Sequence, residues 1–225
     1  MPRWARDGHR FSLTIAVSAQ ATAFIDLPSG QHVALAATWD PRRAELIGSL
    51  LAAECRRKDV DVLLAPTVNL QRSPFGGRNF EFFGEDPFLT AAMGGALVRG
   101  IQRDGVAAAI KHFVANDSET ERFTVHARVG ERALRELYLA PFESIVRQGR
   151  PWVVMAAYNG VNGHAMTESP MLNDILKGEW GFDGVVVSDW RAARTIAAAE
   201  AGLDLVMPGP SGPWAPPSSR LYGKD

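Results

Sequence analysis

Short runs of apolar residues recur along the chain, and each is followed by a polar loop and then by a longer segment with helical spacing. Nearly continuous apolar runs of this length are typical of strands covered on both faces in a parallel sheet. Repeated alternation of strand and helix predicts parallel pairing with right-handed crossovers, and therefore an α/β fold. The runs lie at 60–66, 106–113, 152–159, 184–190 and 203–209, with 32–38 as a candidate sixth.

Two of the predicted helices begin with the same signal. Asp40 and Asp86 can each cap a helix, and each is followed by a proline, which suits the first helical position. Gly105 can end the second of these helices. A third helix is predicted over 130–149, and Pro141 should kink it because proline removes a helical hydrogen bond.

An α/β pattern leaves both a doubly wound sheet and a (β/α)8 barrel open. The sequence contains neither a G-x-G-x-x-G fingerprint after an early strand nor a phosphate-binding G-x-x-x-x-G-K-[ST] loop, and this favours the barrel. A complete barrel typically needs about 250 residues, whereas the chain has 225. We therefore expect a (β/α)8 TIM-barrel-like fold that is incomplete.

Composition narrows the range of partners. A net charge of −1 and the lack of Lys/Arg runs argue against nucleic acid and membrane surfaces as partners. No apolar segment approaches the roughly 20 residues that cross a bilayer.

The single cysteine, Cys55, cannot form an internal disulfide and is expected to be buried. The stretch 11–17 is short and interrupted for a signal sequence, so we expect a cytoplasmic protein.

Polar and aromatic residues stand where the apolar runs end. In a parallel barrel the active site is assembled at the C-terminal ends of the strands. Taken singly, each residue has an ordinary structural explanation, such as an aspartate that caps the next helix. The functional interpretation therefore depends on their shared position at one rim. They are Lys111 and His112, Tyr158 and Asn159, and Asp189 and Trp190, together with Arg78 and Glu81 in the loop after the first run.

This set of side chains suits a sugar. Cationic and carboxylate groups can hydrogen-bond several hydroxyls of one ring while the indole of Trp190 covers its apolar face. The carboxylate of Asp189 could attack or electrostatically support an oxocarbenium-like centre. Lys111 and Arg78 are expected to keep that carboxylate ionised. The five histidines show no metal-ligand spacing, so we expect no metal and no cofactor.

Five ordered stretches resemble glycoside hydrolase family 3, in particular its β-glucosidase-type branch. They are LLAPTVNLQRSPFGGRNFEFFGEDP (63–87), GVAAAIKHFVANDSETERFTV (105–125), ERALRELYLAPFE (131–143), VVMAAYNGVNGHAMTESP (153–170) and LKGEWGFDGVVVSDW (176–190). Several motifs in order at compatible spacing are far more specific than any one of them. The expected organisation is a divergent N-terminal segment over 1–26, the family's N-terminal barrel domain over 27–209, and an irregular tail over 210–225.

The resemblance implies retaining hydrolysis of terminal non-reducing β-D-glucosyl residues, with Asp189 as the nucleophile that forms a covalent glycosyl-enzyme. KHFVANDSE at 111–119 differs from the KHFPGHG associated with the family's N-acetylhexosaminidase branch, so a β-glucoside or β-xyloside is the expected substrate. The residues implied to bind the sugar are Arg78, Lys111, His112, Tyr158 and Trp190.

The sequence departs from the family pattern in three places. Only RDGHR at 6–10 is similar to the family's sugar-binding Asp-Gly-Pro stretch, so Asp7 is a weak counterpart and the first strand is expected to be rewritten or lost. The resemblance also fades after Gly209. The branch takes its acid/base glutamate from a later α/β sandwich domain, which is missing here, so we expect a truncated chain with weak or no activity. The rim carboxylates that could substitute are Glu81, Glu85, Asp117, Glu119 and Glu121.

Two other hypotheses remain open at this point. A non-catalytic sugar-binding remnant would keep the rim and Trp190 without turnover. A (β/α)8 aldolase or lyase would use Lys111 as a Schiff-base amine, although it gives no role to Asp189. The sequence also leaves open the aglycone, the choice between glucose and xylose, and the oligomeric state.

Overall fold

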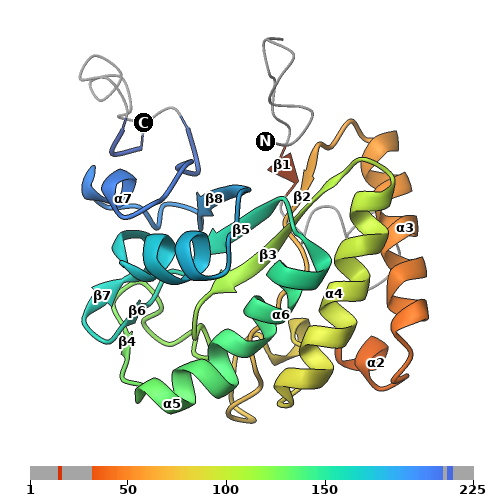
Figure 1. The fold of residues 1–225 in the computed structure, drawn as a ribbon, viewed down its shortest axis with the longest axis horizontal. Coiled ribbons are helices and arrows are strands. Elements are labelled where there is room, and N and C mark those ends of the chain that lie inside the picture. Colours follow the sequence, from red (N-terminus) through yellow and green to blue (C-terminus); the bar gives the residue numbers. More distant parts are fainter. Residues whose placement is uncertain (1–14, 17–31, 210–211, 215–225) are drawn as a thin grey trace.

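The main sheet consists of five parallel strands in the order β1-β2-β3-β5-β8 (Figure 1). The structure, a computed structural model, describes residues 15–16, 32–209 and 212–214. Four of the predicted runs are confirmed as strands, and a first strand of two residues is present, so of the two expectations for it, rewritten or lost, loss is excluded. The strands are β1 (Ile15–Ala16), β2 (Val62–Leu63), β3 (Ala107–Phe113), β5 (Val153–Ala156) and β8 (Val185–Ser188).

The order of the strands in the sheet follows the chain without reversal. Right-handed crossovers then place successive helices on one face, as in a (β/α)8 barrel, whereas a doubly wound sheet reverses at a switch point. The predicted run 203–209 contributes a single parallel bridge, between Leu205 and Val187. Within the ranges that the structure describes, the strands form an open sheet, and closure into a barrel is not seen.

Alternation along the strands divides the core into two apolar clusters. On β3, Ala108 and Ile110 pack with the helices, while Ala107 and Ala109 belong to a second cluster on the opposite side of the sheet. Successive side chains of a strand point to opposite faces. Because both faces are buried, the strands read as continuous apolar runs in the sequence.

Helices α3 (Pro41–Arg57) and α4 (Pro87–Arg103) begin at the predicted Asp-Pro pairs. The carboxylates of Asp40 and Asp86 accept backbone N–H bonds from the first turns, at 3.0 and 2.7 Å. These bonds satisfy donors that a helix start leaves unpaired. Asp86 also ends the long loop that follows β2, so its cap fixes where that loop joins the helix.

Helices α3, α4 and α6 (Ala140–Gly149) lie next to one another over the sheet (Figure 1). The contact between α3 and α4 is made through glycine. A Cβ atom at Gly100 would lie 2.1 Å from the backbone oxygen of Glu45, and Gly48 is equally confined. The two backbones therefore approach more closely than any side chain would allow.

The predicted helix over 130–149 is divided into α5 (Glu131–Ala133), the π-helical η3 (Leu134–Leu139) and α6. Pro141 lies in the first turn of α6. Proline supplies no N–H to the preceding turn, and a π-helical segment is a common form of helix interruption. The winding thus changes just before Pro141.

The prediction of a strand at 32–38 is wrong. Residues His32–Ala36 form helix α2, in which Ala34, Leu35 and Ala36 are strong helix formers. A short apolar run cannot be distinguished from a helical turn by periodicity alone. Cys55 is buried in α3, as predicted.

The remaining elements lie mainly in the loops beyond the strand ends. A small second sheet has the order β4-β6-β7 and sits beside the ends of β3 and β5. These elements are η2 (Asn79–Glu81), β4 (His126–Ala127), β6 (Gly160–Val161), β7 (His164–Ala165), η4 (Met166–Glu168), the π-helical η5 (Leu172–Glu179) and α7 (Ala197–Glu200).

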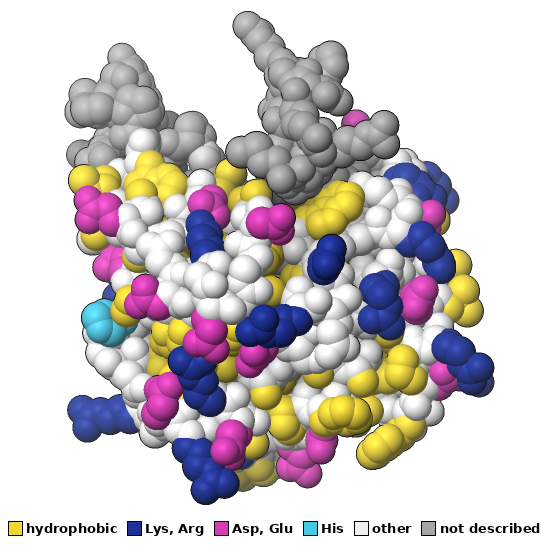
Figure 2. All heavy atoms as spheres, in the orientation of Figure 1, with side chains coloured by type: hydrophobic (Ala, Val, Ile, Leu, Met, Phe, Trp, Pro, Cys, Tyr) yellow, Lys and Arg dark blue, Asp and Glu magenta, His cyan; other side chains and the backbone are white. Residues whose placement is uncertain are grey.

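Positive and negative side chains are interspersed over the face shown in Figure 2. This distribution matches the near-zero net charge of the chain. Among the described residues, no helix has the length and apolar composition that crossing a bilayer requires.

Candidate functional site

The predicted rim residues come together at the C-terminal ends of three neighbouring strands. Lys111 and His112 lie near the end of β3, Tyr158 follows β5, and Asp189 follows β8. All four are buried. Parallel strands end at the same edge of a sheet, which is why positions nearly eighty residues apart in the sequence meet here.

Asp189 has one engaged and one unengaged carboxylate oxygen. Its Oδ1 accepts a hydrogen bond from the backbone N–H of Trp190 at 2.7 Å, and the hydroxyl of Tyr158 is close enough to lower the pKa of the carboxyl. Its Oδ2 lies 3.5 Å from Nε2 of His112 and is buried without a hydrogen-bond partner among the described groups. A buried oxygen left unpartnered is uncommon and calls for a functional explanation.

The pKa of the Asp189 carboxyl is raised above its ordinary value. Burial raises it, and the backbone of Trp190, the cation of Lys111, the hydroxyl of Tyr158 and the guanidinium of Arg78 lower it. From the sequence, Lys111 and Arg78 are predicted to keep the carboxylate ionised. They act in that direction, but burial is the larger effect.

His112 is neutral, and its hydrogen bonds define its tautomer. Burial lowers the pKa of His112 well below its ordinary value, and the nearby cations lower it further. Nη1 of Arg78 lies 3.1 Å from Nε2 of His112. Because a guanidinium can only donate, Nε2 accepts, and Nδ1–H donates to Oδ1 of Asn69 at 3.2 Å. Asn69 also fixes the backbone of His112 through two further hydrogen bonds.

Arg78 and Glu81 form a bidentate ion pair at the mouth of this cluster. Nε and Nη2 of Arg78 donate to the two carboxylate oxygens of Glu81, at 3.0 and 2.7 Å. Thr67 donates to the same carboxylate at 3.1 Å. Burial raises the pKa of Glu81, but Arg78 and Lys111 outweigh it and the net shift is downward. Glu81 is therefore ionised and holds Arg78 toward His112.

Lys111 and Trp190 are the remaining predicted sugar-binding residues; Lys111 is buried, whereas Trp190 is exposed. Burial lowers the pKa of Lys111 to about 8, although Glu81 and Asp189 oppose the shift. Trp190 is 48% exposed, so its ring is accessible from solvent. Asn159 is structural, because it donates to the backbone oxygen of Val114 at 3.1 Å.

Sequence reasoning missed Arg122, which lies in the loop after β3. Its guanidinium stands over the ring of Tyr158 at 4.5 Å and over that of Phe123 at 5.4 Å. Glu119 accepts a hydrogen bond from Arg122 at 2.7 Å. The available signal was the position of these residues in a loop that directly continues an active-site strand.

The other candidate carboxylates stand apart from the cluster. Glu85 and Glu121 are exposed. Burial raises the pKa of Asp117 to about 6, and Tyr138 and Arg72 oppose this shift. Asp7 lies outside the described residues.

Replacing Asp117 with asparagine is expected to stabilise the fold at pH 7.5. The pKa of Asp117 in the folded chain lies above its ordinary value, so folding favours the protonated carboxyl. The ionised carboxylate therefore lowers the free energy of unfolding above pH 6. This loss is recovered as the pH falls through 6. The gain should be about 1 kcal/mol, or about 2–4 °C in Tm, because asparagine has nearly the same shape and removes the buried charge. Thermal unfolding at pH 7.5 and 4.5 checks this, with the exposed Asp183→Asn as control. A lower Tm at pH 7.5 would contradict it.

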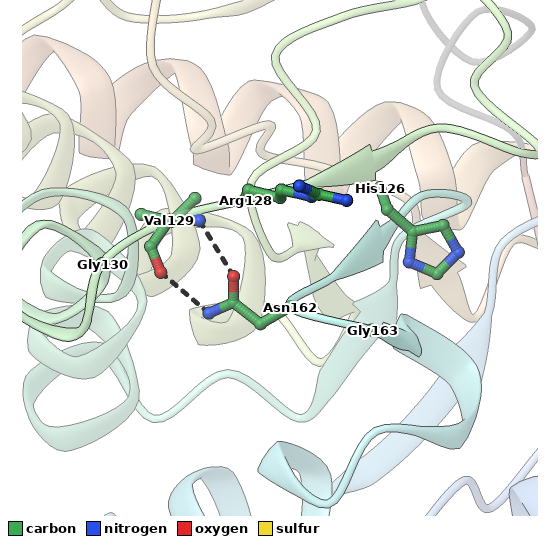
Figure 3. A pocket seen from close by; sticks show the side chains of 6 residues that line it. All are labelled: His126, Arg128, Val129, Gly130, Asn162 and Gly163. Carbon is green, nitrogen blue, oxygen red and sulfur yellow. Dashed lines mark hydrogen bonds between the residues drawn. The ribbon is translucent and has the colours of Figure 1, made fainter.

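An open depression lies beside the small sheet, and its lining includes none of the predicted site residues (Figure 3). The side-chain amide of Asn162 accepts from the backbone N–H of Val129 at 2.9 Å and donates to its carbonyl at 2.8 Å. Asn162 thus joins two loops and has a structural role. The lining residues are His126, Arg128, Val129, Gly130, Asn162 and Gly163. In the part of the chain that the structure covers, no three His, Cys, Asp or Glu side chains are grouped to hold a metal ion.

Known proteins resemble this chain in sequence and structure. Beta-glucosidase B of Emericella nidulans is 54% identical over 179 residues, which are 79% of this chain and 21% of that protein. The structure of beta-glucosidase 3B from Thermotoga neapolitana in complex with glucose has a TM-score of 0.79 at 46% identity and covers 81% of this chain and 26% of that one. The structure of the Kluyveromyces marxianus beta-glucosidase in complex with glucose has a TM-score of 0.82 at 44% identity. The match covers 86% of this chain and 23% of that one.

The chain spans about a fifth of the length of the curated relatives it matches. Residues 19–209 match the model of the glycosyl hydrolase family 3 N-terminal domain. The resemblance inferred from the five sequence motifs is thus confirmed. The chain belongs to glycosyl hydrolase family 3.

Proposed function

We propose that the site serves a β-glucosidase-like hydrolase that removes terminal non-reducing β-D-glucosyl residues with retention of configuration. The observation that carries the proposal is the buried, unpartnered Oδ2 of Asp189. The carboxylate is held by the bond from Trp190 to Oδ1, and Oδ2, which has no hydrogen-bond partner among the described groups, is suited to attack a carbon centre. Relatives named as beta-glucosidases support the same activity.

In the proposed first step, Oδ2 of Asp189 attacks the anomeric carbon of the glucoside. The bond from that carbon to the aglycone oxygen breaks, and the aglycone leaves with the electron pair. The product is a glucosyl ester of Asp189. The oxygen of water then attacks the anomeric carbon, the bond from that carbon to Oδ2 breaks, and the proton that water loses passes to the acid/base group, which leaves glucose and the free carboxylate. The N–H of Trp190 and the hydroxyl of Tyr158 orient the carboxylate throughout.

The surrounding groups are proposed to hold the sugar. Lys111 and Arg78 can donate to ring hydroxyls, and His112, whose ring nitrogens are bonded to Arg78 and Asn69, holds Arg78 in place. The accessible ring of Trp190 can cover the apolar face of glucose. Removing charged donors from water strengthens their hydrogen bonds to a ligand.

The aglycone oxygen also needs a proton, and the rim carboxylates are poor sources. Glu81 is ionised in its pair with Arg78, and Glu119 is paired with Arg122. Asp117 is engaged with Tyr138, outside the cluster. We therefore propose that the acid/base group lies outside the described residues, as expected for a separate sandwich domain.

A dependence on the leaving group follows from this proposal. The 225-residue chain should release dinitrophenol from its β-D-glucoside much faster than it hydrolyses cellobiose. Dinitrophenolate leaves without a proton, whereas general acid catalysis contributes about 10²–10⁴-fold for an alkoxide. Initial rates on both substrates, normalised to binding, measure the difference. Comparable rates would show that the acid is already present in the chain.

The proposed function is tested by trapping the covalent intermediate. A dinitrophenyl 2-deoxy-2-fluoro-β-glucoside should label the chain, and peptide mass spectrometry should locate the glucosyl ester on Asp189. Failure to label, together with glucose binding in calorimetry, would favour the sugar-binding hypothesis instead. A carbonyl substrate trapped on Lys111 by borohydride would favour the aldolase hypothesis.

A further inference from the structure

Glu119 stands between two arginines that come from different parts of the site. Its Oε2 accepts a hydrogen bond from Nη1 of Arg122 at 2.7 Å. Its Oε1 lies 3.9 Å from Nη1 of Arg78 and accepts from the side-chain amide of Asn116 at 3.3 Å. Both carboxylate oxygens are therefore engaged, and the side chain is only 20% exposed.

The arginines that Glu119 contacts each reach a different residue around Asp189. Arg78 donates to His112, and Arg122 covers the ring of Tyr158. Both His112 and Tyr158 approach the carboxylate of Asp189. The carboxylate of Glu119 therefore contacts both arginines, and each arginine contacts a residue that lies beside Asp189.

Packing reinforces this electrostatic contact. A Cβ atom at Gly77 would lie 3.3 Å from Cβ and Cγ of Glu119, so the loop that carries Arg78 lies directly against the Glu119 stem. Arg78 is also held by Glu81 from the other side. Glu81 fixes Arg78 within its own loop, whereas Glu119 fixes the distance between that loop and the one carrying Arg122.

We propose that Glu119 is a positioning residue, whose carboxylate sets the spacing of Arg78 and Arg122 and so preforms the sugar pocket around Asp189. Without this charge, the two guanidinium groups would face each other unscreened in a partly buried setting and move apart. His112 and Tyr158 would then lose the partners that orient them. The inference rests on the proposed function, because it assigns the positioned groups to a sugar site.

The test compares Glu119→Gln with Glu121→Gln, a matched change two residues along the same loop at an exposed side chain. We expect Glu119→Gln to weaken glucose binding about tenfold in calorimetry. It should also broaden the side-chain Nε–H signals of Arg78 and Arg122 in nitrogen-correlated NMR spectra, while the Tm changes little. Glu121→Gln should change neither readout.

A double-mutant cycle with Arg122→Ala separates positioning from general destabilisation. If Glu119 acts through Arg122, then Glu119→Gln should weaken glucose binding less in the Arg122→Ala background than in the wild-type chain. Additive effects, or unchanged arginine signals in Glu119→Gln, would overturn the proposal. Should the glutamine variant fail to fold, Glu119→Asp keeps the charge on a shorter side chain. Its glucose affinity and its arginine Nε–H line widths should then lie between those of the wild-type chain and those expected for Glu119→Gln. If the wild-type chain binds no glucose, the proposed function fails, and the arginine signals alone decide the role of Glu119.

Discussion

Replacing Asp189 with asparagine is expected to abolish aryl β-glucoside turnover and covalent labelling while leaving the fold intact. Asparagine has nearly the same shape, and its oxygen can still accept from Trp190 and Tyr158. It cannot form the glucosyl ester, so the rate should fall by about three orders of magnitude or more. Nitrophenol release and mass spectrometry of the labelled peptide measure this loss.

The stability of Asp189→Asn provides an independent check. The pKa of Asp189 is raised by burial, so the ionised carboxylate weakens the fold at neutral pH. The asparagine variant should therefore unfold at the same temperature as the wild-type chain or at a higher one. A lower Tm would mean that the carboxylate stabilises the fold and would weaken its assignment as a nucleophile.

A matched control and a chemical rescue make the result specific. Asp183→Asn, at an exposed position shortly before β8, should leave turnover unchanged. In Asp189→Gly, added azide should attack the anomeric carbon from the vacated face and give α-glucosyl azide from an activated β-glucoside. Turnover by Asp189→Asn above about a tenth of the wild-type rate, or no azide product, would remove Asp189 from the nucleophile role.

The central members of the site could be predicted because their positions depend on sheet geometry. Lys111 and His112 lie at the end of an apolar run, and Tyr158 and Asp189 lie at the ends of two others; each run has the pattern typical of a strand buried on both faces. Parallel pairing then brings the ends of those strands together. Arg122 was missed because it lies in a long loop, where the local sequence does not determine which residues fold back toward the strand ends.

The errors in the predicted fold have a similar cause. The run at 32–38 is too short for its pattern to separate a strand from a helix, and its alanines favour the helix that forms. Pro141 indicated a break in its helix but not the π-helical winding that precedes it. The pairing of Ile15–Ala16 with Val62–Leu63 is long-range, and a two-residue strand leaves almost no local signal.

The second large effect is expected at the crossing of α3 and α4. Gly100→Ala should destabilise the fold by about 2–3 kcal/mol, because its Cβ would lie 2.1 Å from the backbone oxygen of Glu45. A backbone atom cannot turn aside as a flexible side chain can, so the two helices must separate. This cost exceeds the roughly 1 kcal/mol that alanine gains over glycine within a helix. The expected fall in Tm is about 4–10 °C by thermal unfolding.

Gly95→Ala in the same helix is the matched control, because the two positions differ in their surroundings rather than in helix propensity. The nearest atoms to a Cβ at Gly95 are side-chain atoms of Arg99 and Ile145, at 3.7 and 3.8 Å, which is ordinary contact. Gly95→Ala should therefore raise the free energy of unfolding by up to about 1 kcal/mol, which would raise the Tm slightly. If both variants stabilise the chain, the helices do not cross at the distance described here.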